Sequence, residues 1–295
     1  YVSSVLASLS AFMSDSAMAP PVVRPHLRDL LVGRSKTNTE FVEGARTFDS
    51  GGYTVFRRTV KGKRILLVLD HGPLGHLSIA AHGHADALAI WLHIDGQPVF
   101  VDAGTYLYHA GGAWRDYFRG TKAHNTVSIG STNSSSITGA FNWGLRANCE
   151  IVDPLKEEDG TWSISVAHDG YQNEFRIQHQ REVRFHPDGR IEISDRLIGN
   201  SQNLPPCRAG LLLHPDLTAK GNDGVIDVCH GAARLLSVST PNKQTPMQIE
   251  NGKTEGTPQY SRAFGLKEPT CRLGVEVNHE IQSGVERSAT TMLQV

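Results

Sequence analysis

From residue 53 onward, apolar and polar residues alternate in short segments along most of the chain. In WSISVA (162–167) and RIEIS (190–194), every second side chain is apolar, which is the period of a strand with one buried face. Asp-Gly dipeptides at 95–96, 159–160, 188–189 and 223–224 provide turns between such segments. Strands are expected at 53–58, 64–70, 88–94, 98–102, 126–129, 147–152, 161–167, 175–185, 191–197, 210–214, 235–238 and 271–277. More than ten short strands with no strand–helix alternation predict an all-β fold, an antiparallel β-sandwich.

The first 50 residues follow a different pattern. Apolar residues recur at helical spacing between Val2 and Met13, which predicts an amphipathic helix over residues 1–14. Residues 15–50 are mixed and contain three prolines, as expected for a linker. We therefore divide the chain into a helical remnant with a linker, 1–50, and a β-sandwich domain, 51–295. The packing partner of the helix is expected upstream, as in a fragment or a processed chain.

Composition narrows the range of functions. The chain has 295 residues, 39% of them hydrophobic and 20% charged, with a formal net charge of −1. No overall field therefore favours nucleic acid or a membrane surface as a partner. No apolar run reaches the roughly 18–20 residues needed to span a bilayer. The four cysteines are too far apart for a thiolate metal motif.

Histidines are concentrated in one part of the chain. Seven of the 14 lie between His71 and His124, and several aspartates lie among them. Neutral imidazole and carboxylate are the usual non-thiolate ligands of zinc. His84 ends an HGH triplet, Asp102 closes the segment PVFVD and His124 precedes NTVSI. Each of these three is therefore expected at a strand edge or end, although any one alone is an ordinary surface or turn residue.

The spacing sets a geometric condition on a shared site. If the turn at 95–96 were an ideal two-residue hairpin, position 102 would pair with position 89. His84 would then lie five residues further on, roughly 17 Å away at about 3.4 Å per residue. For His84 and Asp102 to meet, the chain must bend through residues 85–87, or another strand must bring the two together.

Two longer segments carry a family resemblance. AHGHADALAIWLHIDGQPVFVDAGTYLY (81–108) and WRDYFRGTKAHNTVSI (114–129) together resemble the signature of the heparinase II/III-like polysaccharide lyases. Ala103 replaces the usual proline and Gly120 the usual serine. In that family an N-terminal (α/α) toroid precedes an antiparallel β-sandwich, and the active site lies between them. Residues 1–14 would then be a remnant of the last toroid helix.

The resemblance implies a function. It predicts β-elimination on a uronate-containing, acidic polysaccharide such as a glycosaminoglycan or alginate. His84, Asp102 and His124 would bind a structural zinc ion, and His82 would be the catalytic residue of this domain. The missing toroid domain would supply the remaining catalytic groups, so this chain alone would hold one wall of the active site and could be inactive. A periplasmic or secreted location is expected from the resemblance only.

Substrate-binding candidates follow the same segments. The second segment contains three cations, Arg115, Arg119 and Lys122, and one acid, Asp116. The resulting local charge of +2 could attract an anionic sugar chain. The alternative is a solvated loop. Tyr106 and Tyr108 are candidates for stacking on sugar rings, although such aromatics are more often packing residues.

Two other functions remain open. A non-haem iron oxygenase would use His84 and Asp86 as an HxD motif with His124; it predicts that Asp86 binds the metal and Asp102 does not. A non-catalytic carbohydrate-binding or scaffolding module with a structural zinc is the second alternative. In the lyase interpretation, Asp86 would instead hydrogen-bond to the imidazole of a metal-binding histidine and fix its tautomer, or it would cap a turn.

Overall fold

The computed structural model describes residues 41–75, 79–199, 204–222, 224–252, 257–281 and 286–295, together with positions 9, 12 and 13. The chain forms two compact units, Tyr1–Val42 and Glu43–Val295. Apart from those three positions, which are helical, the expected helix over 1–14 lies outside the described residues. Among the described residues, no helix is long and apolar enough to cross a membrane.

The second unit begins with a five-stranded antiparallel sheet in which each strand pairs with the next. Its first strand lies within the range that the sequence assigned to the linker, so the sheet starts before residue 51. At the turns Lys61-Gly62 and Asp95-Gly96 both residues have positive φ, the geometry of the tight hairpin turn that the Asp-Gly signal predicted. The strands are β1 (Gly44–Phe48), β2 (Tyr53–Val60), β3 (Lys63–Asp70), β4 (Ile90–Ile94) and β5 (Gln97–Phe100).

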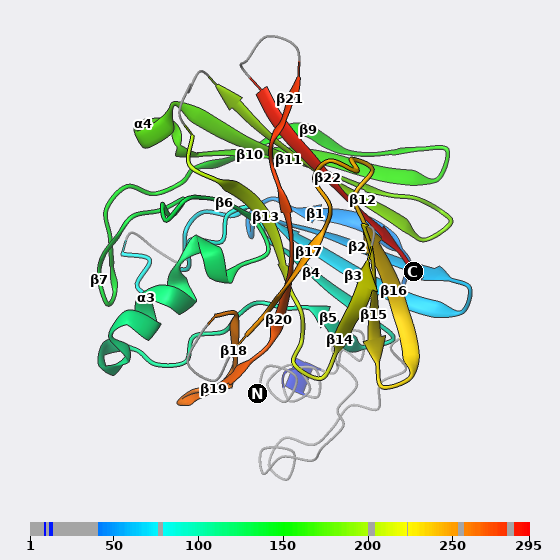
Figure 1. Cartoon of the computed structure of the whole chain (residues 1–295), viewed down its shortest axis with the longest axis horizontal. Helices are drawn as coiled ribbons and strands as arrows, with labels where there is room; N and C mark the ends of the chain where they lie inside the picture. The colour runs from blue at the N-terminus through cyan, green and yellow to red at the C-terminus, as the bar shows by residue number, and fades with distance from the viewer. Residues whose placement is uncertain are drawn as a thin grey trace. The chain divides into compact units, whose positions relative to one another are not determined.

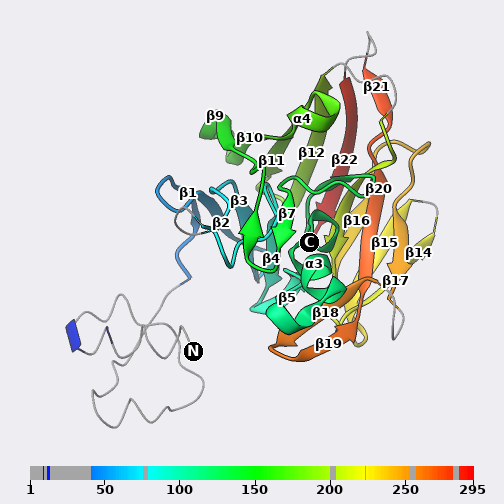
Figure 2. The same cartoon turned by 90° about the vertical axis from the view of Figure 1, so that its left-hand side faces the viewer.

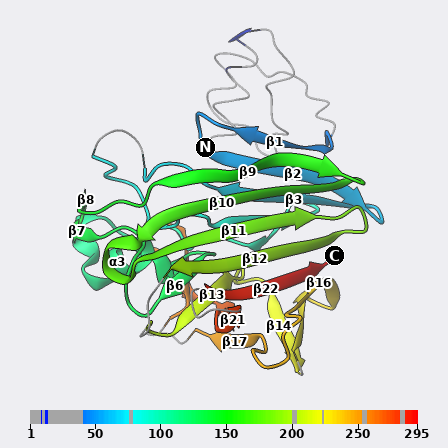
Figure 3. The ribbon, with the colours of Figure 1, turned by 90° about the horizontal axis from the view of Figure 1, so that it is seen from above.

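A nine-stranded antiparallel sheet forms the largest layer. Its strands run in the order β14-β15-β16-β22-β12-β11-β10-β9, and β21 also pairs with β22; Figure 3 shows β9 to β12 and β22 side by side. The strands are β9 (Cys149–Glu158), β10 (Thr161–Tyr171), β11 (Ile177–Phe185), β12 (Arg190–Gly199), β14 (Thr218–Asn222), β15 (Val225–His230), β16 (Ala233–Ser239), β21 (His279–Ile281) and β22 (Glu286–Gln294).

A four-stranded sheet, in the order β17-β20-β13-β6, forms a further layer (Figure 1). Two short hairpins and the helical segments accompany it, and α3 lies near the β18–β19 hairpin in Figures 1 and 2. The remaining elements are β6 (Val127–Ile129), β13 (Cys207–Leu212), β17 (Gln248–Asn251), β20 (Cys271–Glu276), β7 (Ile137–Gly139), β8 (Asn142–Trp143), β18 (Gln259–Ala263), β19 (Leu266–Pro269), η2 (His109–Gly111), α3 (Ala113–Arg119), η3 (Thr121–Ala123) and α4 (Gln172–Phe175).

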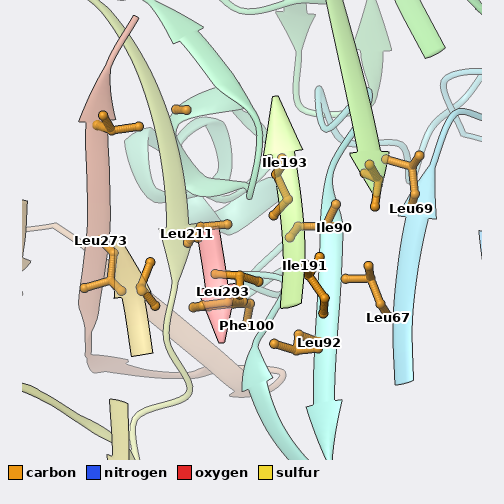
Figure 4. Close-up of a cluster of buried hydrophobic side chains, with 14 of the residues drawn as sticks. Leu67, Leu69, Ile90, Leu92, Phe100, Ile191, Ile193, Leu211, Leu273 and Leu293 are labelled. Atoms are coloured by element: carbon orange, nitrogen blue, oxygen red, sulfur yellow. The ribbon is translucent and has the colours of Figure 1, made fainter. Parts of the chain in front are cut away.

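The three larger sheets share one apolar core. Figure 4 shows Leu67 of β3, Ile193 of β12, Leu211 of β13 and Leu273 of β20 pointing into the same space. Alternation along each strand supplies these side chains, as in β12, where Ile191 and Ile193 are buried. The prediction of an all-β antiparallel sandwich of more than ten strands is confirmed.

Every expected strand is present, with shifted ends, but several further strands were not expected. The clearest case is β22, whose sequence ERSATTMLQ carries mostly small and polar side chains. It nevertheless pairs along its length with β12 and, at its end, with β16. Partner strands far away in sequence therefore decide the conformation of this segment, which its own composition does not indicate.

Candidate active site and metal centre

The HGHAD segment lies in a bent loop, not at a strand end. The loop runs from the end of β3 to the start of β4 at Ile90. Leu88 has a positive φ of 62°, and the Ala89 N–H donates to the Asp86 carbonyl at 2.8 Å, which closes a turn. Residues 85–87 therefore do not continue β4, and the bend that the hairpin geometry required is confirmed.

Contacts to the segment after α3 hold this loop in place. The Ala85 N–H donates to the Arg119 carbonyl at 2.8 Å. The Thr121 hydroxyl donates to the Ala85 carbonyl at 2.8 Å, and the Thr126 hydroxyl donates to the Ala87 carbonyl at 2.8 Å. These bonds satisfy the backbone of an irregular buried loop and join the two sequence segments that carry the family signature.

Asn125 fixes the position of the neighbouring His124. Its side-chain amide donates to the carbonyls of Ile90 at 2.8 Å and Val101 at 3.0 Å. Its side-chain oxygen accepts the Leu212 N–H at 2.6 Å. Because Val101 precedes Asp102 in the chain, one buried amide sets the distance between the segments that carry His124 and Asp102.

Four possible metal ligands converge at this point. One ligand atom each from His84, Asp86, Asp102 and His124 lies within 4.8 Å of all the others. His124 Nδ1 lies 2.8 Å from Asp102 Oδ2, and Asp102 Oδ1 accepts the Gly104 N–H at 2.8 Å. His124 is 1% exposed, and its Nε2 has no hydrogen-bond partner within the described chain. Two imidazoles and two carboxylates at this spacing match the donor set of a zinc ion.

Burial and neighbouring charges shift the pKa values of these groups. Burial favours neutral Asp102, but the charge and hydrogen bond of His124 outweigh it and lower the Asp102 pKa to about 2. The same pairing raises the His124 pKa against the effect of burial. Burial and the charge of His124 lower the His84 pKa to about 3. His84 is thus a neutral imidazole and Asp102 an ionised carboxylate, the protonation states that bind metals, whereas the raised pKa of His124 favours a proton that a metal would have to displace.

The cluster opens into a cavity of about 450 Å³. His82 is exposed at this cavity, and its ring packs edge-on against Tyr108, with centroids 5.1 Å apart, and against Phe141 at 6.0 Å. The two histidines of the HGH triplet therefore differ: both line the cavity, but His84 is partly buried and belongs to the four-residue cluster, whereas His82 is exposed and lies outside it. Gly83 allows the loop to fold closely, since a Cβ there would lie 3.1 Å from the Ala80 carbonyl oxygen.

Three further residues line this cavity that sequence reasoning missed. Tyr53 and Asp70 are cross-strand partners in β2 and β3, and Trp91 follows in β4. Burial and the charge of Asp86 raise the Asp70 pKa to about 7, and burial raises the Asp86 pKa to about 6. No motif marks these residues; only their place at the sheet end nearest the HGH loop could have indicated them.

Arg115 and Arg119 do not form an exposed basic patch. They are 1% and 0% exposed, and only Lys122 of the three cations is exposed. Arg115 Nε donates to the Ala140 carbonyl at 3.1 Å, and Arg119 Nη2 donates to the Gly139 carbonyl at 2.7 Å. The β7–β8 hairpin folds over α3, so both guanidinium groups serve the fold and not a surface for polysaccharide.

The two candidate tyrosines lie in different surroundings. Tyr106 is half-buried and packs against Phe118, with ring centroids 5.7 Å apart. Tyr108 contacts His82 and the exposed Phe264, whose ring centroid is 5.3 Å away. Only Tyr108 therefore lies beside the catalytic candidate, while Tyr106 belongs to a packing cluster.

A buried arginine of β11 supports the site from behind. Arg181 Nη1 donates to the carbonyls of Leu88 and Asn125, each at 2.7 Å. These residues belong to the loops that carry Asp86 and His124. The nine-stranded sheet is thus linked directly to both loops.

Known proteins share this fold and part of the sequence. A family model described as "Heparinase II/III-like, C-terminal" matches residues 42–284. The "Heparin-sulfate lyase" of Bacteroides thetaiotaomicron is 27% identical over 165 residues, 53% of this chain and 21% of that protein. The crystal structure of the heparan sulfate lyase HepC from Pedobacter heparinus superposes with a TM-score of 0.70 at 16% identity, over 99% of this chain and 41% of that one. A heparinase III structure gives 0.68 at 20% identity, over 88% of this chain and 38% of that one.

The chain thus spans between one fifth and two fifths of the length of these relatives. The structural likeness establishes the antiparallel β-sandwich, and the family model covers most of the chain, including the HGH loop, Asp102 and His124. The chain belongs to the heparinase II/III-like family, and its residues 42–284 correspond to the C-terminal domain of that family.

Proposed function

We propose that this chain is the β-sandwich domain of a polysaccharide lyase that cleaves a uronate-containing polysaccharide by β-elimination. One observation carries the proposal. The HGH loop separates its two histidines at one cavity: His84 is partly buried in the His/Asp cluster, while His82 is exposed and lies outside that cluster. Family membership and the names of the relatives support a sulfated glycosaminoglycan of the heparan sulfate type as the first substrate to test.

In this reaction a base removes the proton at C5 of the uronate, next to its carboxylate. The electron pair forms the C4–C5 double bond as the C4–O4 bond breaks, and an acid protonates the departing O4. His82 is the residue of this chain proposed to face the substrate, as the base or as the donor that neutralises the uronate carboxylate. Its contacts with Tyr108 and Phe141 hold the ring at the cavity. The remaining acid–base groups are assigned to the (α/α) toroid domain.

The residues of the cluster fit zinc. Neutral His84, ionised Asp102 and the nearby His124 are the proposed ligands, and Asp86 is close enough to bind or to support them. When bound, zinc would supply a fixed positive charge that holds three chain segments together. In this chain the effect would be to fix the HGH loop, and with it His82, against the segments after β5 and η3. The metal is therefore proposed to be structural.

The function is tested with the full-length protein, including the toroid domain. It is incubated with heparan sulfate, hyaluronan and alginate, while ultraviolet absorbance reports the C4–C5 double bond of the product. We expect a rise with at least one polymer and none with His82→Ala, while a uronate-free glucan serves as the negative control. Absence of a rise with every uronate polymer would rule out the lyase. A periplasmic or secreted location is proposed from the resemblance and would be tested by cell fractionation.

One observation favours the oxygenase alternative strongly enough to test it. Asp86 lies in the same cluster as His84 and His124, as an HxD site requires. The metal content of purified Asp86→Ala and Asp102→Ala variants separates the two functions. The lyase predicts that Asp102→Ala loses the metal. Loss in Asp86→Ala with retention in Asp102→Ala would instead support the oxygenase.

A further inference from the structure

A second cavity lies on the outer face of the four-stranded sheet. Its volume is about 420 Å³, and it is bordered by η3, β6, β13, β17 and β20. It shares no lining residue with the cavity at His82 and His84, but His124 of the four-residue cluster lines it. Three cations, Lys122, Arg208 and Arg272, line it, against one carboxylate, Glu250. The local charge is therefore positive, unlike that of the chain as a whole.

An Arg-x-Gly pattern on two neighbouring strands shapes the floor of this cavity. Gly210 of β13 and Gly274 of β20 are cross-strand partners. Arg272 lies across Gly210, where a Cβ would be 3.1 Å from its Cδ. Arg208 lies across Gly274, where a Cβ would collide with its Nε. The paired glycines thus let two guanidinium groups lie flat along the sheet beneath the cavity.

The two arginines differ in how their charge is compensated. Arg208 forms an ion pair with Glu250, and its Nη2 donates to Gln248 Oε1 at 2.9 Å. Arg272 is 8% exposed and has no ion pair within the described residues. Its Nε and Nη2 lack hydrogen-bond partners there, although the guanidinium also bonds to the Tyr117 side chain. A buried cation with unused donors is costly unless an anion joins it.

We propose that this outer cavity binds the carboxylate or sulfate group of an acidic sugar, as a second binding site that is distinct from the cavity at His82 and borders the cluster at His124. Guanidinium donors match the planar carboxylate and the sulfate oxygens. Arg272 provides the buried charge, and the exposed Lys122 stands at the rim. The choice of a sugar rests on the proposed function, whereas the anion site rests on these residues alone.

The proposal is tested by equilibrium binding of a fluorescently labelled heparin hexasaccharide to this chain, measured by anisotropy at fixed salt. Arg272→Met is expected to weaken binding about tenfold or more. Lys122→Ala is expected to weaken it about two- to fivefold. Glu250→Gln removes the competing carboxylate and is expected to tighten binding by a similar factor. Weaker binding in Lys122→Ala together with tighter binding in Glu250→Gln is specific for an anion site.

Three controls complete the experiment. Lys156→Ala removes an exposed lysine of β9 and is expected to leave binding unchanged. Asp70→Asn, which alters the other cavity, is expected to leave this binding intact, and a change would instead place the binding at the His82 cavity. A desulfated hexasaccharide distinguishes carboxylate from sulfate. If Arg272→Met does not fold, Lys122→Ala and Glu250→Gln decide. The proposal is overturned if neither changes affinity, or if no saturable binding occurs.

Discussion

The domain contains two pairs of a buried histidine and an aspartate, with nearly equal hydrogen-bond lengths but opposite character. His124 Nδ1 lies 2.8 Å from Asp102 Oδ2, and His179 Nε2 lies 2.7 Å from Asp195 Oδ1. The Asp102 side chain is 32% exposed, whereas that of Asp195 is 1% exposed. His124 keeps one ring nitrogen without a partner in the described chain, while both ring nitrogens of His179 are bonded.

The hydrogen bonds around His179 form a continuous chain from Gly170 to Arg181. His168 Nδ1 accepts the Gly170 N–H at 3.0 Å, so its proton lies on Nε2 and is donated to His179 Nδ1 at 3.1 Å. His179 then donates from Nε2 to Asp195, which also accepts two bonds from Arg181. Burial lowers the pKa of both histidines, which are therefore neutral.

The difference teaches how to separate a structural pair from a functional one. In the Asp195 pair, both ring nitrogens of His179 and both carboxylate oxygens are hydrogen-bonded, and the pair lines neither of the two cavities described above. This is typical of a network that stabilises a core. The Asp102 pair borders further ligand atoms and an open cavity, and its donors are incompletely used. Residue type and hydrogen-bond length alone would not distinguish them.

The largest expected effect on stability comes from disrupting the His179–Asp195 pair. Asp195→Asn leaves the Arg181 charge buried without its carboxylate, and we expect a loss of about 3–5 kcal/mol in the free energy of unfolding, measured by urea denaturation. Asp102→Asn in metal-free protein is the matched control, with an expected loss of about 1 kcal/mol. The Arg181→Met/Asp195→Leu double variant should recover most of the stability. Equal losses in the two single variants would contradict the comparison.

The next largest effect is the stabilisation expected when zinc binds at the His124–Asp102 pair. Zinc at 100 times its dissociation constant is expected to raise the free energy of unfolding by about 2.7 kcal/mol, measured by denaturation with zinc or with a chelator. His84→Ala and Asp102→Asn should abolish this increase because they remove proposed ligands. His82→Ala is the control and should keep it. An unchanged increase in Asp102→Asn would exclude Asp102 from the metal site.

A smaller effect is the pH dependence of stability caused by Asp70, which lines the cavity at His82. The Asp70 pKa is raised to about 7, so the folded state binds more protons than the unfolded state between about pH 4 and 7. Its contribution to stability is therefore present at low pH and is lost as the pH rises through 7. In chelator-treated protein, Asp70→Asn should flatten this dependence and stabilise the fold at pH 8 by about 1–2 kcal/mol.

Thermal unfolding across the pH range measures this effect. Asp153→Asn, on the exposed part of β9, is the matched control and should leave the profile unchanged. If Asp70→Asn destabilises the protein at pH 8, the carboxylate is compensated there and its raised pKa is not the dominant influence.

The sequence predicted the fold well where alternation was strong. WSISVA and RIEIS lie within β10 and β12, but β22 was missed because Ser, Thr and Ala carry too little hydrophobic contrast. For the site, the motifs identified His84, Asp102 and His124. What brings them together is less local: the hydroxyls of Thr121 and Thr126 and the Asn125 amide bind backbone more than 20 residues away. Such contacts leave no periodic pattern.

The two arginines predicted to bind substrate show the opposite limit of sequence-based prediction. Arg115, Arg119 and Lys122 give their segment a local charge of +2, which suggested a basic patch for an anionic sugar chain. Their burial depends on a hairpin at 137–143 that folds back over α3. Exposure of a charged residue cannot be judged from neighbouring positions when a later segment covers it.

The smallest expected effect on stability is at His82, where the effect on activity should be largest. The side chain is exposed, and its packing consists of edge-on contacts with Tyr108 and Phe141. His82→Ala should therefore change the free energy of unfolding by no more than about 0.5 kcal/mol, measured by urea denaturation. His82→Gln, which keeps a polar side chain, is the companion variant. A loss above about 2 kcal/mol, or loss of zinc stabilisation, would mean that His82 positions His84 instead of facing substrate. Near-wild-type stability with abolished lyase activity in the full-length protein would separate the two histidines of the triplet as the structure does.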